Sequence, residues 1–217
     1  MKILAIDTAT ERCSVALSDD GIIEERATDT QRGHAELILP MIAAVLEAGG
    51  LGLRDLDAVA YGRGPGAFTG VRIAVGVVQG LAYGARLPTV GVSDLAALAQ
   101  QATRPGEEAL VCMDARMGEV YWARFVMDPN GGFVRPLSEE RVGPPASVSA
   151  GGASVFIGAG FKAHPQLAAL RPARLHDEML PRAREIALLA QPEVRAGRGQ
   201  PADRATPVYL RDKVVGK

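Results

Sequence analysis

The chain has 217 residues, of which 47% are apolar and 23% charged, a composition typical of a globular protein. This length fits one large domain or two small ones. The net charge of −1 lacks the basic excess of many nucleic-acid-binding domains. The wide spacing of Cys13 and Cys112 predicts buried, reduced thiols and no disulfide framework. Because no run of about 18 apolar residues and no signal-like segment is found, we expect a cytoplasmic protein that does not enter a membrane.

The chain opens with a predicted β-meander. Its strands are short apolar or alternating runs separated by turn residues, at 2–8, 13–19 and 21–28. A helix is expected over 34–48, in which Leu37, Met41 and Val45 share one face. Pro40 inside this pattern predicts a kink or a late start of the helix.

The next segment alternates strands with helices. The expected elements are a strand at 55–64, a helix at 70–87, a strand at 88–93 and a helix at 93–102. Thr69 is the candidate N-cap of the first helix, and Ser93 or Asp94 of the second. The run TRPGEE at 103–108 is a turn-rich boundary. A first domain with the element order βββαβαβα is therefore expected over residues 1–105.

Beyond this boundary the pattern begins again with strands, so residues 106–217 predict a second, smaller α/β domain. Its expected elements are a hairpin at 109–128 that turns around 116–118, a strand at 153–160, and helical runs at 164–171 and 182–191. The last helix is a candidate to pack back on the first domain. The segment 197–207 predicts a loop.

Seven glycines fall within residues 61–84. Three of them, Gly76, Gly80 and Gly84, recur every four residues along the predicted helix. A glycine inside a helix costs roughly 1 kcal/mol relative to alanine, so the repeat requires a reason. A stripe of small residues lets two backbones approach closely. It either packs on the sheet of its own domain or receives the helix of a partner.

The glycine loop before this helix lacks the residues of a P-loop, which needs Lys and Ser/Thr after its glycines. A dinucleotide fingerprint that starts at Gly62 has Ala67 in its third place, but Pro65 lies inside the turn and no clean βαβ unit precedes it. Asp7 follows the first predicted strand. Its carboxylate either faces a cleft or caps its own turn.

No catalytic or metal-binding constellation is found in the sequence. The histidines have no second His or Cys at ligand spacing; they are His34, His164 and His176. No GxSxG nucleophile elbow occurs. We therefore expect neither a metal nor a catalytic residue.

Several motifs resemble the TsaB (YeaZ) family of the actin/Hsp70/sugar-kinase (ASKHA) superfamily. They are DTATERCSVAL, GRGPGAFTGVRIAVGVVQGLAYG, DARMGEVYWARF and PVYLRD, spread over essentially the whole chain. The resemblance implies a two-domain α/β ASKHA-like fold and a non-catalytic subunit. In this family the subunit works with TsaD, which transfers threonylcarbamoyl to the adenosine beside the anticodon of tRNAs that read A-starting codons, and with the ATPase TsaE. The resemblance also implies a homodimer when TsaD is absent, contact with tRNA through the complex, and no membrane. A transferase or peptidase label would reach this chain by homology alone.

The resemblance also assigns site residues. TsaD-like chains carry an HxxxH metal pair on the helix that here follows residue 93, and Asp94 and Leu98 occupy its two positions. Leu cannot bind a metal, so the metal site is expected to be lost and Asp94 to cap its helix. The two helices of the first domain are expected to form the partner interface. Its residues are Leu37, Met41, Val45, Arg72, Gly76, Gly80 and Gly84, with Arg72 pairing a carboxylate at the rim.

A nucleotide-dependent kinase or ATPase on the same fold is the alternative. Asp7 and Thr8 would then lie near phosphates, and Gly158 and Gly160 of FIGAGF would contact an adenosine. ATP or ADP would bind between the domains or at the complex interface, and otherwise no cofactor is expected. Against this alternative, DTAT lacks the glycine that many phosphate loops of the superfamily use. ATP turnover by the purified protein distinguishes the two functions.

Overall fold

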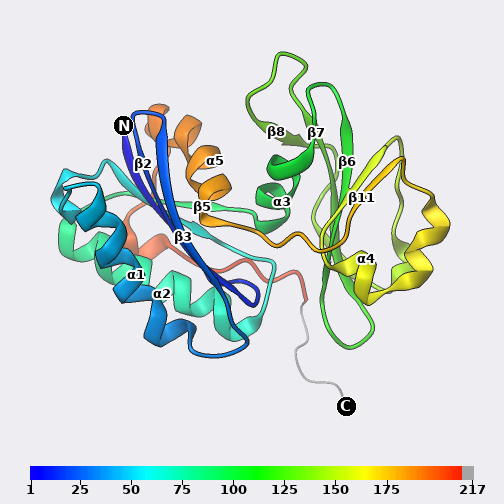
Figure 1. Ribbon diagram of the computed structural model, residues 1–217, viewed down its shortest axis with the longest axis horizontal. Helices are drawn as coiled ribbons and strands as arrows, with labels where there is room; N and C mark the ends of the chain where they lie inside the picture. Colours follow the sequence, from blue (N-terminus) through cyan, green and yellow to red (C-terminus); the bar gives the residue numbers. More distant parts are fainter. Residues whose placement is uncertain (212–217) are drawn as a thin grey trace. The chain divides into compact units, whose positions relative to one another are not determined.

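The structure is a computed structural model that describes residues 1–211 and divides into two compact units (Figure 1). Unit 1 comprises Met1–Asp94 and Pro181–Val208, and unit 2 comprises Leu95–Leu180 and the chain from Tyr209 onward. The last residue of the PVYLRD motif, Asp212, lies outside the described residues, as does the end of the predicted second domain.

The boundary between the units lies before the one predicted at residue 105. Helix α3 (Asp94–Ala102) belongs to unit 2 except for its first residue. The side chain of Gln100 donates a hydrogen bond to the carbonyl of Gly132, and that of Gln101 to the carbonyl of Leu180. These bonds tie α3 to the second unit, whereas the TRPGEE turn that follows it is a connection inside that unit.

Unit 1 is built on a five-stranded sheet with the order β3-β2-β1-β4-β5. Its strands are β1 (Lys2–Asp7), β2 (Arg12–Asp19), β3 (Ile22–Asp29), β4 (Ala58–Gly62) and β5 (Thr89–Val92). The first three strands are antiparallel, as the predicted meander requires, and β1, β4 and β5 run parallel. In this register Leu4 lies between Leu17 and Val59, so apolar side chains align across the strands. The predicted order βββαβαβα is confirmed along residues 2–102, although its last helix belongs to unit 2, and a short 3-10 turn, η1 (Leu53–Asp55), precedes β4.

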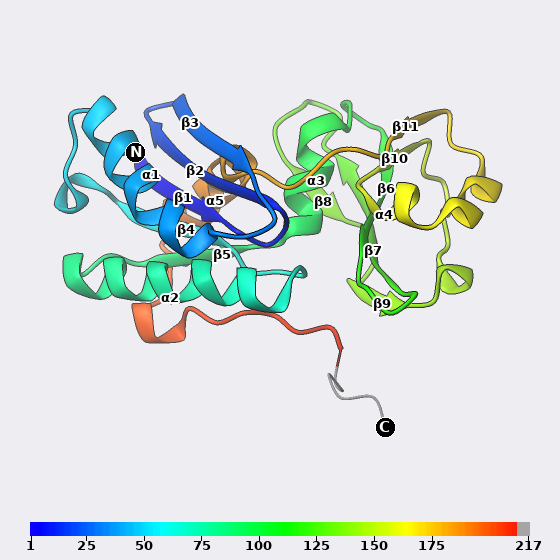
Figure 2. The same cartoon turned by 60° about the horizontal axis from the view of Figure 1, so that its bottom comes forward.

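Helices cover both faces of this sheet. Helices α1 (His34–Ala48) and α2 (Phe68–Ala85) lie on one face and α5 (Ala183–Arg195) on the other (Figure 2). The core under α1 and α2 is aliphatic, with Leu4, Ile6, Val15, Ile38, Ile42, Val59, Ala74 and Val78 among its buried residues. On the other face, Ile186 of α5 is fully buried, and Ser14 of β2 accepts a hydrogen bond from the first amide of α5, at Ala183. The last helix thus packs on unit 1.

The start of α1 agrees with the helix predicted over 34–48, whereas the start of α2 differs from its prediction. α1 begins at His34 and continues through the exposed Pro40, so the late start is not observed. α2 begins at Phe68 with Ala67 at its cap position and no side-chain cap. Thr69 therefore lies inside the first turn and is not the N-cap.

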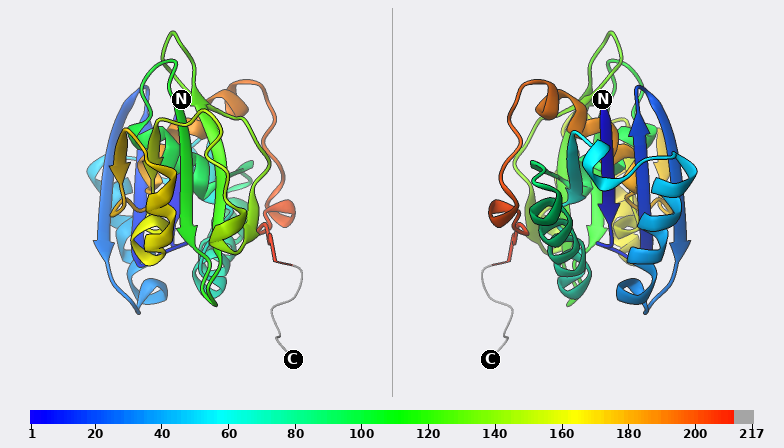
Figure 3. Two further views of the ribbon diagram at one scale, coloured as in Figure 1. Left: turned by 90° about the vertical axis from the view of Figure 1, so that its right-hand side faces the viewer. Right: turned by 90° about the vertical axis from the view of Figure 1, so that its left-hand side faces the viewer.

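Unit 2 holds a second sheet with the order β11-β10-β6-β7-β8, and β9 pairs with β7. Its strands are β6 (Glu108–Asp114), β7 (Val120–Met127), β8 (Val134–Pro136), β9 (Arg141–Gly143), β10 (Val155–Ile157) and β11 (Arg174–His176). The predicted hairpin is confirmed as β6–β7, drawn in green in Figure 3, and its turn places Arg116, Met117 and Gly118 at positive φ. The helical segments are short: α4 (Gly160–Ala163), η2 (Pro145–Ser147) and η3 (Pro165–Leu170). Phe156 and Phe161 stack in the core with ring centroids 5.0 Å apart.

The segment after α5 runs back along unit 1. Gln200 forms a two-bond bridge with Thr89 at the outer edge of β5. The turn η4 (Ala202–Arg204) follows, and Ala205 after it is buried in the core beside α2. The side chain of Gln79 on α2 donates a hydrogen bond to the Ala205 carbonyl at 2.8 Å. The predicted loop is therefore an ordered strap that covers the edge of the sheet.

Candidate functional site

Two carboxylates meet where the parallel strands of unit 1 end. β1 ends in Asp7, β4 ends in Gly62, and α3 begins with Asp94 just after β5. The side chains of both aspartates are fully buried. A Cβ added at Gly62 would lie 2.5 Å from Asp94 Oδ1 and 2.7 Å from Asp7 Oδ1, so a side chain there would collide with both. The carboxyl ends of parallel strands are the usual ligand edge of open α/β sheets.

The side chains of Asp7 and Thr8 both form hydrogen bonds with backbone groups of unit 1. Asp7 Oδ1 accepts a hydrogen bond of 2.8 Å from the amide of Ala9, two residues on, so the carboxylate caps its own turn. The Thr8 hydroxyl donates to the carbonyl of Gly70 at 2.7 Å. These contacts fix the start of α2 on the end of β1. A contact of Asp7 or Thr8 with a phosphate stays a prediction.

The sequence predicted that Asp94 caps its own helix, but its side chain bonds elsewhere. Its Oδ2 accepts a hydrogen bond of 2.6 Å from the amide of Gly64, in the loop after β4. Leu98, at the position where the resemblance to TsaD-like chains would place the second His, is fully buried. Within residues 1–211, no group of three or more His, Cys, Asp or Glu side chains is arranged to hold a metal ion.

The environment of the two aspartates raises the pKa of both. For Asp7, burial raises the pKa from the usual 3.8, and the Ala9 amide offsets part of this effect. For Asp94, burial raises the pKa well above 3.8, and the negative charge of Asp7 raises it further. Among the described residues, Asp7 Oδ2 and Asp94 Oδ1 are buried acceptors without a donor.

Gly158 and Gly160 lie in unit 2 and pack tightly on β6. A Cβ at Gly158 would overlap the carbonyl oxygen of Cys112, and one at Gly160 would lie 2.8 Å from the carbonyl carbon of the same residue. Close packing is therefore enough to explain these two glycines. Their contact with an adenosine stays a prediction.

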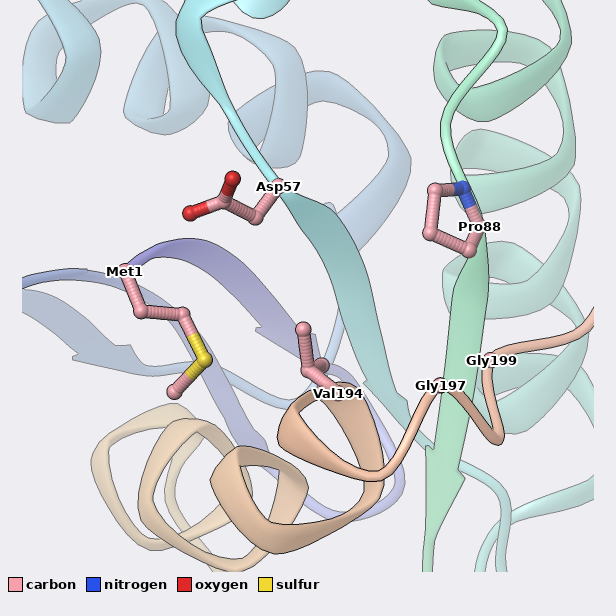
Figure 4. Close-up of a pocket in the computed structure, with 6 residues that line it drawn as sticks. All are labelled: Met1, Asp57, Pro88, Val194, Gly197 and Gly199. Atoms are coloured by element: carbon pink, nitrogen blue, oxygen red, sulfur yellow. The ribbon is translucent and has the colours of Figure 1, made fainter.

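A pocket of about 440 Å³ lies at the opposite, amino ends of the same strands (Figure 4). It is lined by Met1, Asp57, Pro88, Val194, Gly197 and Gly199. Asp57 is the one ionisable side chain in this lining, and its Oδ2 already accepts a hydrogen bond of 2.7 Å from the amide of Lys2. The lining offers no combination of acid, base and nucleophile.

The glycine stripe of α2 faces away from the sheet. Gly76, Gly80 and Gly84 are exposed, and no atom described by the structure lies within 4 Å of a Cβ built on any of them. The helix packs on its own sheet through a different face, which includes Ala74 and Val78. Of the two uses considered for the stripe, packing on the domain's own sheet is excluded.

The residues around the stripe are apolar as well. Ile73, Val77 and Leu81 are partly buried at the margin of the core, and Tyr83 is 82% exposed. No charged residue occurs in α2 between Arg72 and the end of the helix. The helix of a monomeric domain normally carries charged and polar residues on its solvent side. The outer face of α2 is instead typical of a helix that packs against another helix.

Not every residue assigned to this face reaches it. Leu37 and Met41 of α1 are partly buried at the margin of the core. Val45 is fully buried, because positions 38, 42 and 45 of α1 recur at helical spacing and face the sheet. Val45 therefore cannot belong to the exposed face, and its predicted place in the partner interface is wrong.

Arg72 continues the stripe by one turn. Its guanidinium carbon lies 3.2 Å from the centroid of the Phe68 ring, and its Nη1 donates a hydrogen bond of 3.0 Å to the Phe68 carbonyl. The arginine thus stacks on the first residue of its own helix. Its predicted pairing with a carboxylate of a partner stays a prediction.

By length and composition, α2 is the one helix among the described residues that could cross a membrane. A core helix of a folded domain passes the same test, and the inner face of α2 packs on a sheet. Its apolar character therefore needs an explanation within a folded α/β unit.

The comparisons with known proteins agree with one another. The family model "TsaD: tRNA N6-adenosine threonylcarbamoyltransferase" matches residues 13–214. The chain is 43% identical to the tRNA threonylcarbamoyladenosine biosynthesis protein TsaB of Escherichia coli over 225 aligned residues, which cover 100% of this chain and 97% of that protein. It is 38% identical to the protein of the same name from Haemophilus influenzae, covering 100% and 96%.

Solved structures give the same result. YeaZ from Pseudomonas aeruginosa superimposes with a TM-score of 0.90 at 41% identity, covering 96% of this chain and 99% of that one. A second structure from this organism, described as similar to the peptidase YEAZ, also has a TM-score of 0.90, at 42% identity with 97% and 99% coverage. The architecture is accordingly the α/β, ASKHA-like fold of these structures. The chain belongs to the TsaB (YeaZ) family.

Proposed function

We propose that this protein is a non-catalytic subunit of the machinery that adds threonylcarbamoyl to adenosine beside the anticodon of tRNAs reading A-starting codons. It acts in the cytoplasm and binds TsaD through the outer faces of α1 and α2. TsaE joins the assembly, and tRNA is contacted through the complex. Without TsaD, the same helix face pairs two copies of this chain.

The observation that carries the docking role is the open glycine stripe. Gly76 and Gly80, in the interior of α2, cost about 2 kcal/mol of helix propensity relative to alanine. Nothing described in unit 1 uses the room they leave. A partner helix laid over Gly76, Gly80 and Gly84 would use this room and would cover the neighbouring Ile73 and Val77. The full-length similarity to proteins named TsaB supports the pathway.

The non-catalytic role is supported by the residues around Asp7 and Asp94, at the carboxyl ends of the parallel strands of unit 1. Leu98 stands where a metal-binding His is expected, and the Thr8 hydroxyl already donates to the carbonyl of Gly70. We propose no cofactor for this subunit alone. The kinase or ATPase alternative rests only on the resemblance of this chain to the superfamily, and no contact in unit 1 favours it.

A reconstituted reaction tests this proposal. We expect tRNA lacking the modification to be modified when TsaD, TsaE, ATP, a threonylcarbamoyl donor and this protein are all present. This protein alone should turn over neither ATP nor the donor, because no base–nucleophile pair is assembled among the residues that the structure describes. Modified adenosine is measured by mass spectrometry of digested tRNA. Full modification without this protein, or multiple turnover of ATP by this protein alone, would refute the proposal.

A further inference from the structure

We propose that Asp7 and Asp94 share a single proton, and that this proton holds together the end of β1, the loop from Gly62 to Gly66 and the start of α3. The device is independent of the partner proteins, since all the groups involved lie within unit 1.

The hydrogen-bonding pattern of the pair is complete except at one place. Asp7 Oδ1 is satisfied by the amide of Ala9, and Asp94 Oδ2 by the amide of Gly64. The other two oxygens, Asp7 Oδ2 and Asp94 Oδ1, have no donor in the described structure, although both side chains are fully buried. A buried acceptor without a donor costs about 1–3 kcal/mol, and more when it is charged. The side chains of Asp7 and Asp94 are hydrogen-bond partners of each other, and two carboxyl groups can form such a bond only when a proton lies between them.

The alternative of two ionised carboxylates is strongly unfavourable here. Two buried like charges repel, and one of the two groups then takes up a proton. With one proton the contact becomes a charge-assisted O–H···O⁻ hydrogen bond, which is among the strongest in proteins. The crowding at Gly62, where even a single added carbon atom would collide with both carboxyl groups, favours a proton over a hydrated ion.

Asp94 is the donor and Asp7 the acceptor. Asp7 receives backbone hydrogen bonds from Ala9 and Thr8, which stabilise its anion, and the proton-bearing Asp94 side chain stabilises it further. The pKa of Asp94 is raised by burial and by the charge of Asp7, so Asp94 keeps its proton.

Three other ionisable groups face the pair. The charge of His34 on α1 lowers the pKa of Asp7, and the charge of Arg63, in the loop after β4, lowers the pKa of Asp94. The pKa of Cys13 on β2 is raised to about 11 by burial and by the charge of Asp7. None of these groups can replace the shared proton as donor to both orphaned oxygens. Comparison of the wild type with Asp94→Asn at each pH isolates the contribution of the pair.

The shared proton makes the stability of unit 1 dependent on pH. Asp94 has a higher pKa when folded than the ordinary 3.8, so the folded state binds a proton that the unfolded state releases. Its contribution to stability is complete below pH 3.8 and is lost as the pH rises through the folded pKa. Above about pH 6, where Asp7 is ionised, and up to the folded pKa of Asp94, the equilibrium constant for unfolding should rise about tenfold per pH unit on account of this one proton.

Asp94→Asn tests the proposal, because the amide keeps a donor toward Asp7 and an acceptor for the Gly64 amide. We expect infrared difference spectra of the wild type at pH 7 to show the band of a buried protonated carboxyl group, and the variant to lack it. The variant should lack the roughly tenfold rise per pH unit in the equilibrium constant for unfolding that the wild type owes to the proton on Asp94. The matched control is Glu24→Gln, which removes one carboxylate at an exposed position of β3 and should keep both the band and the slope.

Asp7→Asn provides a second test, since its amide donates to an ionised Asp94 and the band should again be absent. The proposal is overturned if the wild type shows no such band, or if its pH slope equals that of Asp94→Asn. It is also overturned if one equivalent of Mn²⁺ binds to the wild type but not to Asp94→Asn, because the two oxygens would then form a cation site.

Discussion

Replacing Gly80 by leucine is expected to weaken the binding of TsaD by roughly five- to 150-fold while the folded monomer stays at least as stable as that of the wild type. Overfilling a tightly packed contact typically costs about 1–3 kcal/mol, and about 1.4 kcal/mol corresponds to a factor of ten in affinity. Within unit 1 the new side chain enters open space, since no described atom lies within 4 Å of a Cβ at Gly80. Loss of a helix-interior glycine adds up to about 1 kcal/mol of stability.

Isothermal titration with TsaD and thermal unfolding of the isolated protein measure the two effects. Sedimentation of the protein without TsaD should show a matching shift from dimer to monomer. Ala196→Leu is the control, because it adds an exposed leucine at the end of α5, which lies on the other face of the sheet, and should leave affinity unchanged. Unchanged TsaD affinity in Gly80→Leu would show that the stripe is not the binding face.

The same substitution is expected to have opposite effects at two glycines of α2. Gly70→Ala should destabilise unit 1 by about 1–3 kcal/mol, because the added Cβ overlaps the carbonyl oxygen of Thr8 and the backbone cannot yield cheaply. Moving the two backbones apart also breaks the hydrogen bond from the Thr8 hydroxyl to the carbonyl of Gly70, which is worth about 1 kcal/mol. This loss offsets the gain in helix propensity from replacing a glycine. Gly76→Ala meets no atom and should stabilise the isolated protein by up to about 1 kcal/mol.

Hydrogen exchange of the β1 and β4 amides measures both changes inside unit 1, and circular dichroism gives the unfolding temperatures. The two variants serve as controls for each other, since they differ only in their position on one helix. Equal stabilities for the two alanine variants would mean that Gly70 does not rest on Thr8 as the structure shows.

The order of elements in unit 1 could be predicted from the sequence because its strands and helices have clear periods and turn signals. The face of α2 that packs on the sheet could not be predicted in this way. Apolar residues surround this helix almost completely, so periodicity does not separate the side of Ala74 and Val78 from the side of Gly76 and Gly80. The same reason explains Val45, since α1 is apolar over a wide arc.

Asp7 was a candidate site residue from the sequence, but its pairing with Asp94 was missed for a different reason. Asp94 has the local pattern of an N-cap, and its actual partner, the Gly64 amide, is thirty residues away in sequence. The available signal was positional: Asp7, Gly62 and Asp94 each follow a parallel strand, and parallel strands end at one edge of a sheet. The boundary before α3 leaves no local signal, because it depends on tertiary packing.

The return of residues 181–208 to unit 1 has a consequence for synthesis on the ribosome. Chains generally fold from the N-terminus as they emerge, but the five strands of unit 1 precede the helix that covers one of their faces by the whole of unit 2. Until α5 has left the exit tunnel, the face carrying Ile3 and Ala5 lacks the helix that covers it in the finished protein. Contacts between such distant parts of a chain are slow to form. Completion of the first sheet to emerge therefore waits for nearly the last residues to be made, and a nascent chain arrested before Pro181 is a natural client for chaperones.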